Sequence, residues 1–289
     1  MLTTVVPLRE DNPAVFLSAY VLENSPEFQT GTRRPAVVVC PGGGYFFTSD
    51  REAEPVALRF LARGYHAFVL RYSVRTRFPE PMLDLARAML TIREHADEWL
   101  VDPDQLTVCG FSAGGHLAAS LGVFWDKPWL HDALGVGGDQ IRPAALILGY
   151  PVIDIDLVSD RQDRGELGDE SVPANEAIYS VVLGERQPAR EIKDRYRLDL
   201  HVSAATPPAF LWHTADDDLV FAPNALRFAA ALAEHRVPYE LHVFESGVHG
   251  LSLADETTDV QGQFINPYAQ VWIDLALRWL QRRREQHSA

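Results

Sequence analysis

Cysteine is scarce in this sequence: Cys40 and Cys109 are the two in 289 residues, and two cysteines cannot form a disulfide framework. Basic residues are also few, 26 against 40 acidic ones, which gives a formal net charge of −14. An acidic balance of this size argues against a protein that coats nucleic acid or an anionic membrane. No apolar run approaches the roughly 20 residues that span a bilayer. We therefore expect neither a nucleic acid nor a membrane as partner.

Targeting and metal-binding motifs are missing as well. The N-terminal stretch MLTTVVPLREDNPAVF has no basic segment followed by an apolar core, so it does not resemble a signal peptide. The chain contains neither His-Glu-x-x-His nor Cys-x-x-Cys, the spacings typical of zinc sites. We expect a reduced, cytoplasmic protein without a metal or another cofactor. The sequence leaves monomer and homodimer both open.

The sequence does contain the alternation of short apolar runs and helical patterns that is typical of α/β proteins with a largely parallel sheet. We expect a single domain over residues 1–289 with about eight strands. The apolar runs predict strands at 5–8, 15–22, 36–40, 66–72, 106–110, 144–149, 209–213 and 240–245. The 3.6-residue periodicity predicts helices at 53–63, 82–100, 114–124, 224–235 and 268–284.

Residues 154–206 interrupt this rhythm. They are rich in Asp, Arg, Glu, Gly and Pro, and their apolar pieces are short. About fifty residues without a strand inside an α/β pattern indicate an insertion over one end of the sheet. We expect this insertion to cover a site in part, as a cap.

A candidate nucleophile lies where a predicted strand meets a predicted helix, in the Gly-Phe-Ser-Ala-Gly run at 110–114. The Gly-x-Ser-x-Gly pattern is weak alone, but a serine between a buried strand and a helix can occupy a tight, strained turn with small neighbours. The alternative is a turn that merely caps the helix. We favour Ser112 as a nucleophile, with the backbone N–H of Ala113 as an oxyanion donor.

A second candidate segment is the Pro-Gly-Gly-Gly-Tyr run at 41–45, directly after the strand at 36–40. Three glycines let backbone N–H groups point inward, as acyl transfer requires at a tetrahedral oxyanion. A flexible turn and a phosphate-binding loop are the alternatives, although the latter lacks its Gly-Lys-Ser/Thr ending. Tyr45, Phe46 and Phe47 follow, and either wall an acyl pocket or pack in the core.

The candidate acid and base lie late in the chain. Three aspartates at 216–218 follow the strand at 209–213, and one of them could orient a histidine, unless they form a solvated turn that caps the next helix. His249 follows the last predicted strand between Gly247 and Gly250, and the order Ser, Asp, His is that of α/β hydrolases. His213 is the second choice of base. His116, one turn into the nucleophile helix, is expected to bond locally.

Several segments together carry a family resemblance: CPGGGY, SDREAEPVAL, GFSAGGHLA, YPVI, HVSAATPP, LWHTADD and GVHGLSLA occur in this order. From about Cys40 onward the chain resembles the α/β-hydrolase superfamily, and more narrowly its acetyl xylan esterase and feruloyl esterase-like branch, the xylanase-associated esterases. The resemblance implies Ser112 as nucleophile, His249 as base, Asp217 as acid, and the N–H groups of Gly43, Gly44 and Ala113 as oxyanion donors. It also implies acetyl or feruloyl esters of plant polysaccharides as substrates.

The sequence departs from this family pattern at three positions. Pro41 stands where related esterases have histidine, and Thr214 where glycine is common. Phe221 replaces a proline, so the choice between Asp216 and Asp217 stays open to a slip of one residue.

We therefore predict a serine esterase that acts through an acyl-enzyme on acetylated xylo-oligosaccharides or similar carbohydrate esters. Bulky rings after the glycine loop predict a preference for short acyl groups, with the 154–206 insertion on the side of the alcohol. A general short-chain carboxylesterase or a feruloyl esterase is the first alternative. A peptidase of the same superfamily and a non-catalytic binding protein are more distant ones, because the chain has no gating domain and keeps all four catalytic elements.

Overall fold

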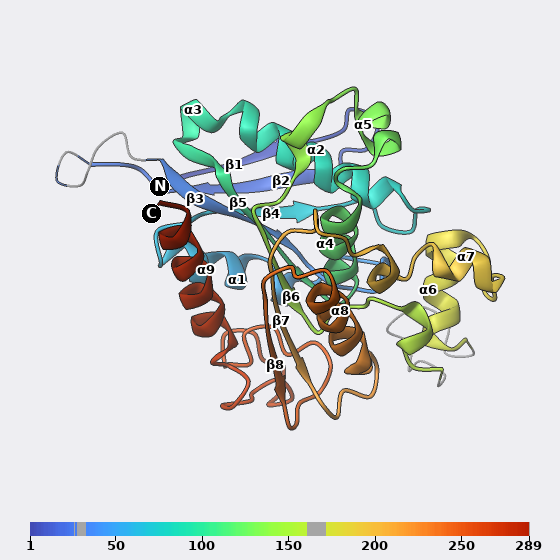
Figure 1. Cartoon of the computed structure of the whole chain (residues 1–289). Helices are drawn as coiled ribbons and strands as arrows, with labels where there is room; N and C mark the ends of the chain where they lie inside the picture. The colour runs from blue at the N-terminus through green and yellow to red at the C-terminus, as the bar shows by residue number, and fades with distance from the viewer. Residues whose placement is uncertain (26, 28–32, 161–171, 289) are drawn as a thin grey trace.

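The computed structural model describes residues 1–25, 27, 33–160 and 172–288, and their strands form one eight-stranded sheet (Figure 1). The strand order is β1-β2-β4-β3-β5-β6-β7-β8, in which β1 and β2 are antiparallel to their neighbours and β3 to β8 run parallel. The strands are β1 (Leu2–Pro7), β2 (Phe16–Val21), β3 (Arg34–Cys40), β4 (His66–Arg71), β5 (Val101–Phe111), β6 (Ala145–Gly149), β7 (Ala209–Thr214) and β8 (Tyr239–Phe244). The predicted sheet of about eight mostly parallel strands is confirmed.

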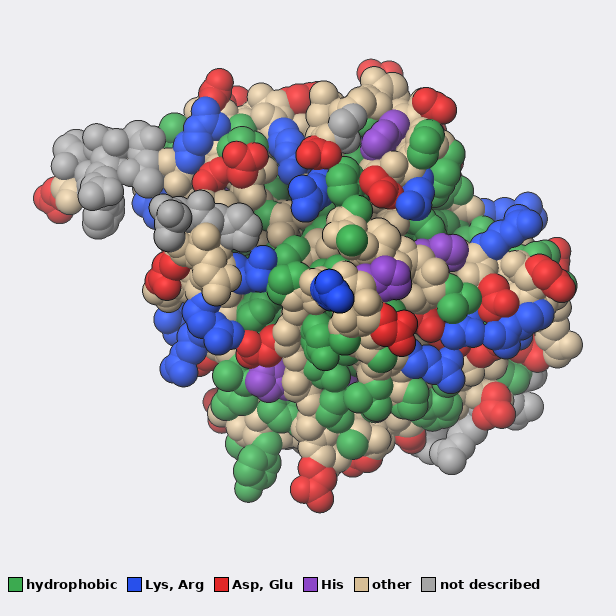
Figure 2. All heavy atoms as spheres, in the orientation of Figure 1, with side chains coloured by type: hydrophobic (Ala, Val, Ile, Leu, Met, Phe, Trp, Pro, Cys, Tyr) green, Lys and Arg blue, Asp and Glu red, His purple; other side chains and the backbone are tan. Residues whose placement is uncertain are grey.

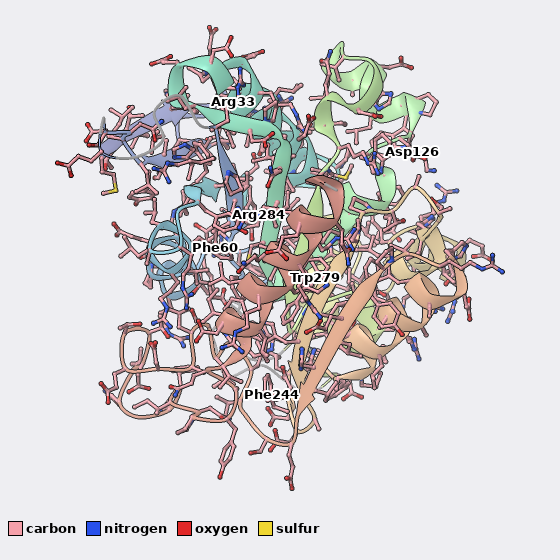
Figure 3. All side chains as sticks on the ribbon, turned by 60° about the vertical axis from the view of Figure 1, so that its left-hand side comes forward. Arg33, Phe60, Asp126, Phe244, Trp279 and Arg284 are labelled. Carbon is pink, nitrogen blue, oxygen red and sulfur yellow. The ribbon has the colours of Figure 1, made fainter. Side chains whose placement is uncertain are left out.

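Helices cover both faces of the sheet because the parallel strands are apolar on both sides. Along β3, alternate residues belong to two separate apolar clusters, with Val38 on one face and Val37 and Val39 on the other. The first face packs against α2 (Glu80–Glu94), α4 (Ser112–Phe124) and α8 (Pro223–Glu234). The opposite face packs against α1 (Glu54–Leu61) and α9 (Trp272–Ser288), whose Phe60 and Trp279 are labelled in Figure 3.

Outside the 154–206 segment, the helices differ from the sequence prediction chiefly before β5 and after α4. The expected helix over 82–100 is divided into α2 and a short α3 (Ala96–Trp99), because His95 between them leaves helical backbone at φ −93° and ψ 10°. An unpredicted helix, α5 (Pro128–Leu134), begins with a proline and ends at Gly135 with φ +66°, which are common start and stop signals for a helix.

Residues 154–206 contain α6 (Ala174–Leu183) and α7 (Arg190–Asp194) together with short 3₁₀ turns. Residues 161–171 of this segment lie outside the described part of the chain. In the rest of the segment the structure records no named strand, and Val158 forms an isolated antiparallel bridge with Val220. Figure 1 shows α6 and α7 at the side of the sheet, beyond α4 and α8.

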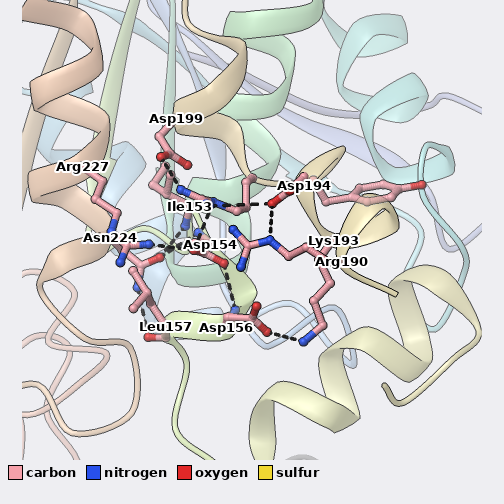
Figure 4. Close-up of polar contacts among 12 residues, drawn as sticks. Ile153, Asp154, Asp156, Leu157, Arg190, Lys193, Asp194, Asp199, Asn224 and Arg227 are labelled. Atoms are coloured by element: carbon pink, nitrogen blue, oxygen red, sulfur yellow. Dashed lines mark hydrogen bonds and ion pairs between the residues drawn. The ribbon is translucent and has the colours of Figure 1, made fainter. Parts of the chain in front are cut away.

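A cluster of charged side chains holds this segment to the rest of the fold (Figure 4). Asp154 is 3 % exposed, and its Oδ2 accepts a hydrogen bond from Arg227 of α8 at 2.9 Å while Arg197 lies 3.2 Å away. Lys193 of α7 bonds Asp156 at 2.6 Å. Burial raises the pKa of Asp154, and the N–H of Asp156 and the charge of Arg197 oppose this rise. Arg227 therefore anchors the start of the segment to α8, and the pairs of Arg197 and Lys193 tie the later part of the segment to its start.

On the face shown in Figure 2, basic and acidic side chains are interspersed with apolar ones. In the described part of the chain, no helix combines the length and the hydropathy needed to cross a bilayer.

Candidate active site

The sequence-predicted site residues come together at the carboxyl edge of the parallel strands. Gly43 and Gly44 follow β3, Ser112 follows β5, Asp217 follows β7 and His249 follows β8. Because parallel strands end at the same edge of a sheet, loops that are distant in sequence meet there. This topology explains how residues up to 137 positions apart can form one hydrogen-bonded group.

Ser112 lies at a strained turn between β5 and α4, with φ +52°. A non-glycine residue in this left-handed region costs on the order of 1–3 kcal/mol and is held there by its surroundings. A Cβ on Gly110 would come within 2.1 Å of the carbonyl oxygen of Gly114, and one on Gly114 within 2.1 Å of the carbonyl oxygen of Cys40. The two glycines of the pattern are therefore required by close backbone contact, as the sequence predicted.

A chain of hydrogen bonds connects Ser112, His249 and Asp217. Ser112 Oγ lies 2.8 Å from His249 Nε2, and His249 Nδ1 lies 2.7 Å from Asp217 Oδ2. With its proton on Nδ1, the imidazole donates to the carboxylate and accepts from the serine hydroxyl. A ring held in this way can take the hydroxyl proton while the carboxylate stabilises the imidazolium.

The geometry distinguishes between the two candidate aspartates. Asp217 is 3 % exposed, and its Oδ1 accepts from the N–H groups of Leu219 and Val220 at 3.0 and 2.9 Å. Asp216 is exposed and accepts from the N–H of Gly247 at 2.7 Å. Burial alone would raise the pKa of Asp217, but the charge of His249 and hydrogen bonds from His213 and His249 outweigh it and hold this pKa well below its usual range. Asp217 is therefore placed as an ionised partner of the imidazole.

The other two histidines considered in the sequence have different partners. His213 Nε2 donates to the carbonyl of Val220 at 2.8 Å and lies 3.5 Å from Asp217 Oδ2. His116 lies in the core, where the hydroxyl of Tyr45 is 2.7 Å from its Nδ1. Burial lowers the pKa of His116 from 6.5 to about 4, so the ring is neutral near pH 7.

The glycine loop and Ala113 border the same cavity as Ser112 and His249. Gly43 has φ +124° and Gly44 φ +60°, and a Cβ on Gly43 would meet the carbonyl oxygen of Phe47 at 2.2 Å. The carbonyl of Gly43 accepts from the N–H groups of Phe46 and Phe47, which closes the loop into a tight turn. Ala113 lies in the first turn of α4, where unpaired N–H groups favour negative charge.

The three aromatic residues after this loop have separate positions. Tyr45 is 2 % exposed and packs in the core against Tyr72 and His116. Phe46 is half-buried against the same core, with the guanidinium of Arg75 over its ring at 5.5 Å. Phe47 is 46 % exposed and lines the cavity beside Ser112. Of the three, Phe47 alone has the position expected of a pocket wall.

The cavity at this edge has a volume of about 490 Å³, and its lining residues include two chemically different sets. The first set, called here the apolar side, is buried or half-buried and also packs in the core cluster around α4: Val152, Val158, Ile178, Leu219 and Val220. The second set, called here the polar side, is more exposed and combines Ser49, Arg51 and Gln263 with Phe47, Val260 and Phe264. Val158 and Ile178 belong to the 154–206 segment, so this segment contributes directly to the cavity wall.

Arg51 and Glu52, within the DREAEP motif, also line the cavity, and sequence reasoning gave them no role. Arg51 donates through Nε to the carbonyl of Thr258 at 2.6 Å and through Nη2 to that of Gly250 at 2.8 Å. Its guanidinium lies 3.5 Å from the centre of the Phe264 ring. Arg51 thus ties down the loop that follows His249. The DREAEP motif marked these residues as part of the family resemblance. The partners of Arg51 lie about 200 residues away in sequence, so they could not be inferred from spacing.

Within the described ranges, no group of three or more His, Cys, Asp or Glu side chains is arranged to hold a metal ion.

The class of the protein follows from these features together. A mostly parallel eight-stranded sheet with a strained serine turn after β5, followed in chain order by a hydrogen-bonded aspartate and histidine, is the arrangement of an α/β hydrolase. The chain belongs to the BD-FAE family, whose family model matches residues 25–232. The predicted resemblance to this esterase branch is confirmed.

Solved structures extend the match over nearly the whole chain. It is similar to the carboxylesterase Cest-2923 of Lactobacillus plantarum WCFS1, with a TM-score of 0.84 and 31 % identity over 98 % of both chains. It is also similar to an acetyl ester-xyloside bifunctional hydrolase of Caldicellulosiruptor lactoaceticus, with a TM-score of 0.77 and 33 % identity over 96 % of both chains. Both of these matched proteins are named as hydrolases of esters.

Curated relatives are longer than this chain. Endo-1,4-beta-xylanase B of Butyrivibrio fibrisolvens is 33 % identical over 234 residues, which are 78 % of this chain and 33 % of that protein. The chain spans between about a third and three fifths of the length of the curated relatives that it matches.

Proposed function

We propose that the protein hydrolyses short-chain carboxylic esters through an acyl-enzyme on Ser112. The observation that carries this proposal is the chain of hydrogen bonds from Ser112 through His249 to Asp217, at 2.8 and 2.7 Å, beside the glycine loop. Ser112 Oγ attacks the ester carbonyl while its proton passes to His249 Nε2. The negative oxygen that forms is stabilised by N–H groups of Gly43, Gly44 and Ala113.

The second half of the reaction uses the same groups. His249 returns its proton to the alcohol oxygen as the carbon–oxygen bond breaks, which leaves the acyl group on Ser112. Water then gives a proton to His249 and attacks the acyl carbon. Collapse of the second tetrahedral intermediate releases the acid and restores the serine hydroxyl.

We further propose that the substrates are acetyl esters of xylo-oligosaccharides or of similar carbohydrates. The name of the Caldicellulosiruptor relative, an acetyl ester-xyloside hydrolase, supports this substrate class. The polar side of the cavity supports it as well, because Ser49, Arg51 and Gln263 can form hydrogen bonds with sugar hydroxyl groups.

The two sides of the cavity suggest how such an ester is oriented. An acetyl group needs a small apolar space, and the buried side with Val152, Val158 and Ile178 provides one. An oligosaccharide needs an open, polar side, which lies around Phe47 and Gln263. We therefore assign the acyl group to the side of the 154–206 segment, the reverse of the assignment suggested by the sequence. The segment acts in this proposal as a cap within a single domain.

The decisive experiment compares two serine variants of the same helix. Ser112→Ala is expected to lower turnover of p-nitrophenyl acetate by about 10⁶-fold, the usual cost of a lost triad nucleophile. Ser120→Ala is the matched control, because Ser120 is buried in α4 and donates to the carbonyl of His116. It should keep wild-type turnover. More than a few per cent of activity in Ser112→Ala would remove Ser112 as the nucleophile.

The substrate class requires a separate measurement. Release of acetate from acetylated xylo-oligosaccharides should exceed, in kcat/KM, hydrolysis of p-nitrophenyl acetate by the same preparation. A protein that cleaves the p-nitrophenyl ester but leaves the acetylated oligosaccharides intact is an esterase of another substrate class.

A further inference from the structure

Glu52 is a buried carboxylate that the reaction described above does not use. It is 4 % exposed and ends the short turn Asp50–Glu52, inside the DREAEP motif that is part of the family resemblance. Its Oε2 accepts from the N–H of Gly42 at 2.7 Å, and its Oε1 accepts from the hydroxyl of Tyr150 at 2.6 Å. Both carboxylate oxygens are therefore engaged, one by the glycine loop and one by the residue after β6.

The bond to Gly42 bears directly on the glycine loop. The N–H of Gly42 is held by Glu52, and its carbonyl accepts from the N–H of Ser49 at 3.0 Å. That carbonyl belongs to the same planar peptide as the N–H of Gly43, so fixing the carbonyl also fixes the direction of this N–H. A Cβ on Gly42 would meet Glu52 Oε2 at 2.8 Å and Ser112 Cβ at 2.9 Å. Gly42 is thus packed between the carboxylate and the nucleophile.

The bond to Tyr150 reaches the histidine loop. The hydroxyl oxygen of Tyr150 accepts from the N–H of Ser252 at 2.8 Å, three residues after His249. The ring of Tyr150 meets the imidazole of His249 edge-on, with centroids 5.0 Å apart. Ser252 is fixed further by its own hydroxyl, which donates to the carbonyl of Arg51, and by Trp272, whose Nε1 donates to the carbonyl of Ser252.

We propose that Glu52 is a positioning residue that aligns the oxyanion donor Gly43 with the imidazole of His249. This inference rests on the proposed serine mechanism. Two donors converge on Glu52 from two loops, and only a carboxylate offers an acceptor to each. A glutamine side chain has one acceptor oxygen, so its amide would face one of the two donors with N–H groups.

The test uses Glu52→Gln in the full chain with p-nitrophenyl acetate. Loss of one buried, charge-assisted hydrogen bond corresponds to about a 10- to 100-fold effect. We expect kcat to fall by this factor while KM changes by less than about threefold. A boronic acid that mimics the tetrahedral intermediate should lose affinity by the same factor as kcat/KM, since it places an oxygen among the same donors.

A matched control separates positioning from stability. Asp84 is also a fully buried carboxylate that accepts from a backbone N–H, that of Ser73 at 2.9 Å, but it lies in α2. Asp84→Asn should lower the midpoint of thermal unfolding and leave kcat and boronate affinity unchanged. Tyr150→Phe keeps the bond from Gly42 and should lower kcat by about three- to tenfold, which provides a readout even if Glu52→Gln does not fold.

The outcomes are distinguishable from failure of the proposed function. If Ser112→Ala is inactive and folded Glu52→Gln keeps wild-type kcat, the positioning role is overturned and the serine mechanism stands. A fall in kcat without a parallel fall in boronate affinity also overturns it. If Glu52→Gln does not fold and Tyr150→Phe keeps wild-type kcat, the role is overturned as well. If Ser112→Ala is active, the serine mechanism itself fails.

Discussion

Replacing Asp217 by asparagine tests how the imidazole is oriented. The amide oxygen of the new side chain can occupy the place of Oδ1, where the N–H groups of Leu219 and Val220 require an acceptor at 3.0 and 2.9 Å. The amide NH₂ then stands where Oδ2 was, 2.7 Å from His249 Nδ1. Two N–H groups cannot face each other there, so the ring must carry its proton on Nε2, the nitrogen that faces Ser112.

The expected cost is large because this tautomer cannot accept the serine proton. Triads with the wrong tautomer lose about 10⁴-fold in kcat, which corresponds to about 5.5 kcal/mol of transition-state stabilisation. Asp216→Asn is the matched control, since asparagine keeps an oxygen for the N–H of Gly247, which Asp216 accepts at 2.7 Å in an exposed position. We expect this variant to lose less than about threefold.

The assay is the initial rate of p-nitrophenyl acetate hydrolysis at pH 8. Active-site titration gives the concentration of wild-type active sites, and both variants are assayed at the same concentration. The reasoning is refuted if Asp216→Asn loses more activity than Asp217→Asn. It is also refuted if Asp217→Asn keeps a tenth of wild-type kcat, because the tautomer would then not control the reaction.

Two further predictions concern acyl length and pH. Ile178→Ala, on the apolar side of the cavity, should raise kcat/KM for p-nitrophenyl octanoate relative to acetate by about 10-fold or more, whereas Phe47→Ala should leave this ratio unchanged; the opposite ranking would return the acyl group to the aromatic side. The pKa of buried His116 is lowered from 6.5 to about 4, so only the unfolded chain binds a proton between these pH values. The free energy of unfolding should therefore fall as pH decreases from 6.5 to 4, by up to about 3 kcal/mol from this residue. Urea titrations of wild type and His116→Gln should show a shallower pH dependence in the variant, and identical slopes would contradict the assignment.

The sheet could be predicted because its strands have strong local signals. The runs at 36–40, 144–149 and 209–213 are apolar on both faces, and a strand buried between two helix layers requires this composition. The turn at Ser112 was predictable for a similar reason, since a Cβ on Gly110 would meet the carbonyl oxygen of Gly114 only two residues beyond Ser112, although the contact that requires Gly114 is with Cys40 at the end of β3. Structural requirements that involve neighbouring residues can be recognised in the local sequence.

The cavity wall was not predictable from local sequence. Tyr45 and Phe47 are two residues apart in one tight turn, yet Tyr45 bonds His116 in the core and Phe47 faces the cavity. Phe46 packs against the core between them. Which ring points inward depends on the positive φ values of Gly43, Gly44 and Tyr45. These backbone angles cannot be inferred from three consecutive aromatic residues in a sequence.

The charged residues of the motif at 50–54 illustrate the same limit over a longer distance. Glu52 bonds a residue 10 positions away and another 98 positions away, and Arg51 reaches carbonyls 199 and 207 positions away. Such contacts exist only after the sheet has brought the loops after β3, β6 and β8 to one edge. The alignment of the glycine loop with His249 therefore depends on side chains that take no part in proton transfer. Variants at Glu52 and Arg51 change the arrangement of the site and leave Ser112, His249 and Asp217 in place, so they separate the effect of positioning from that of proton transfer.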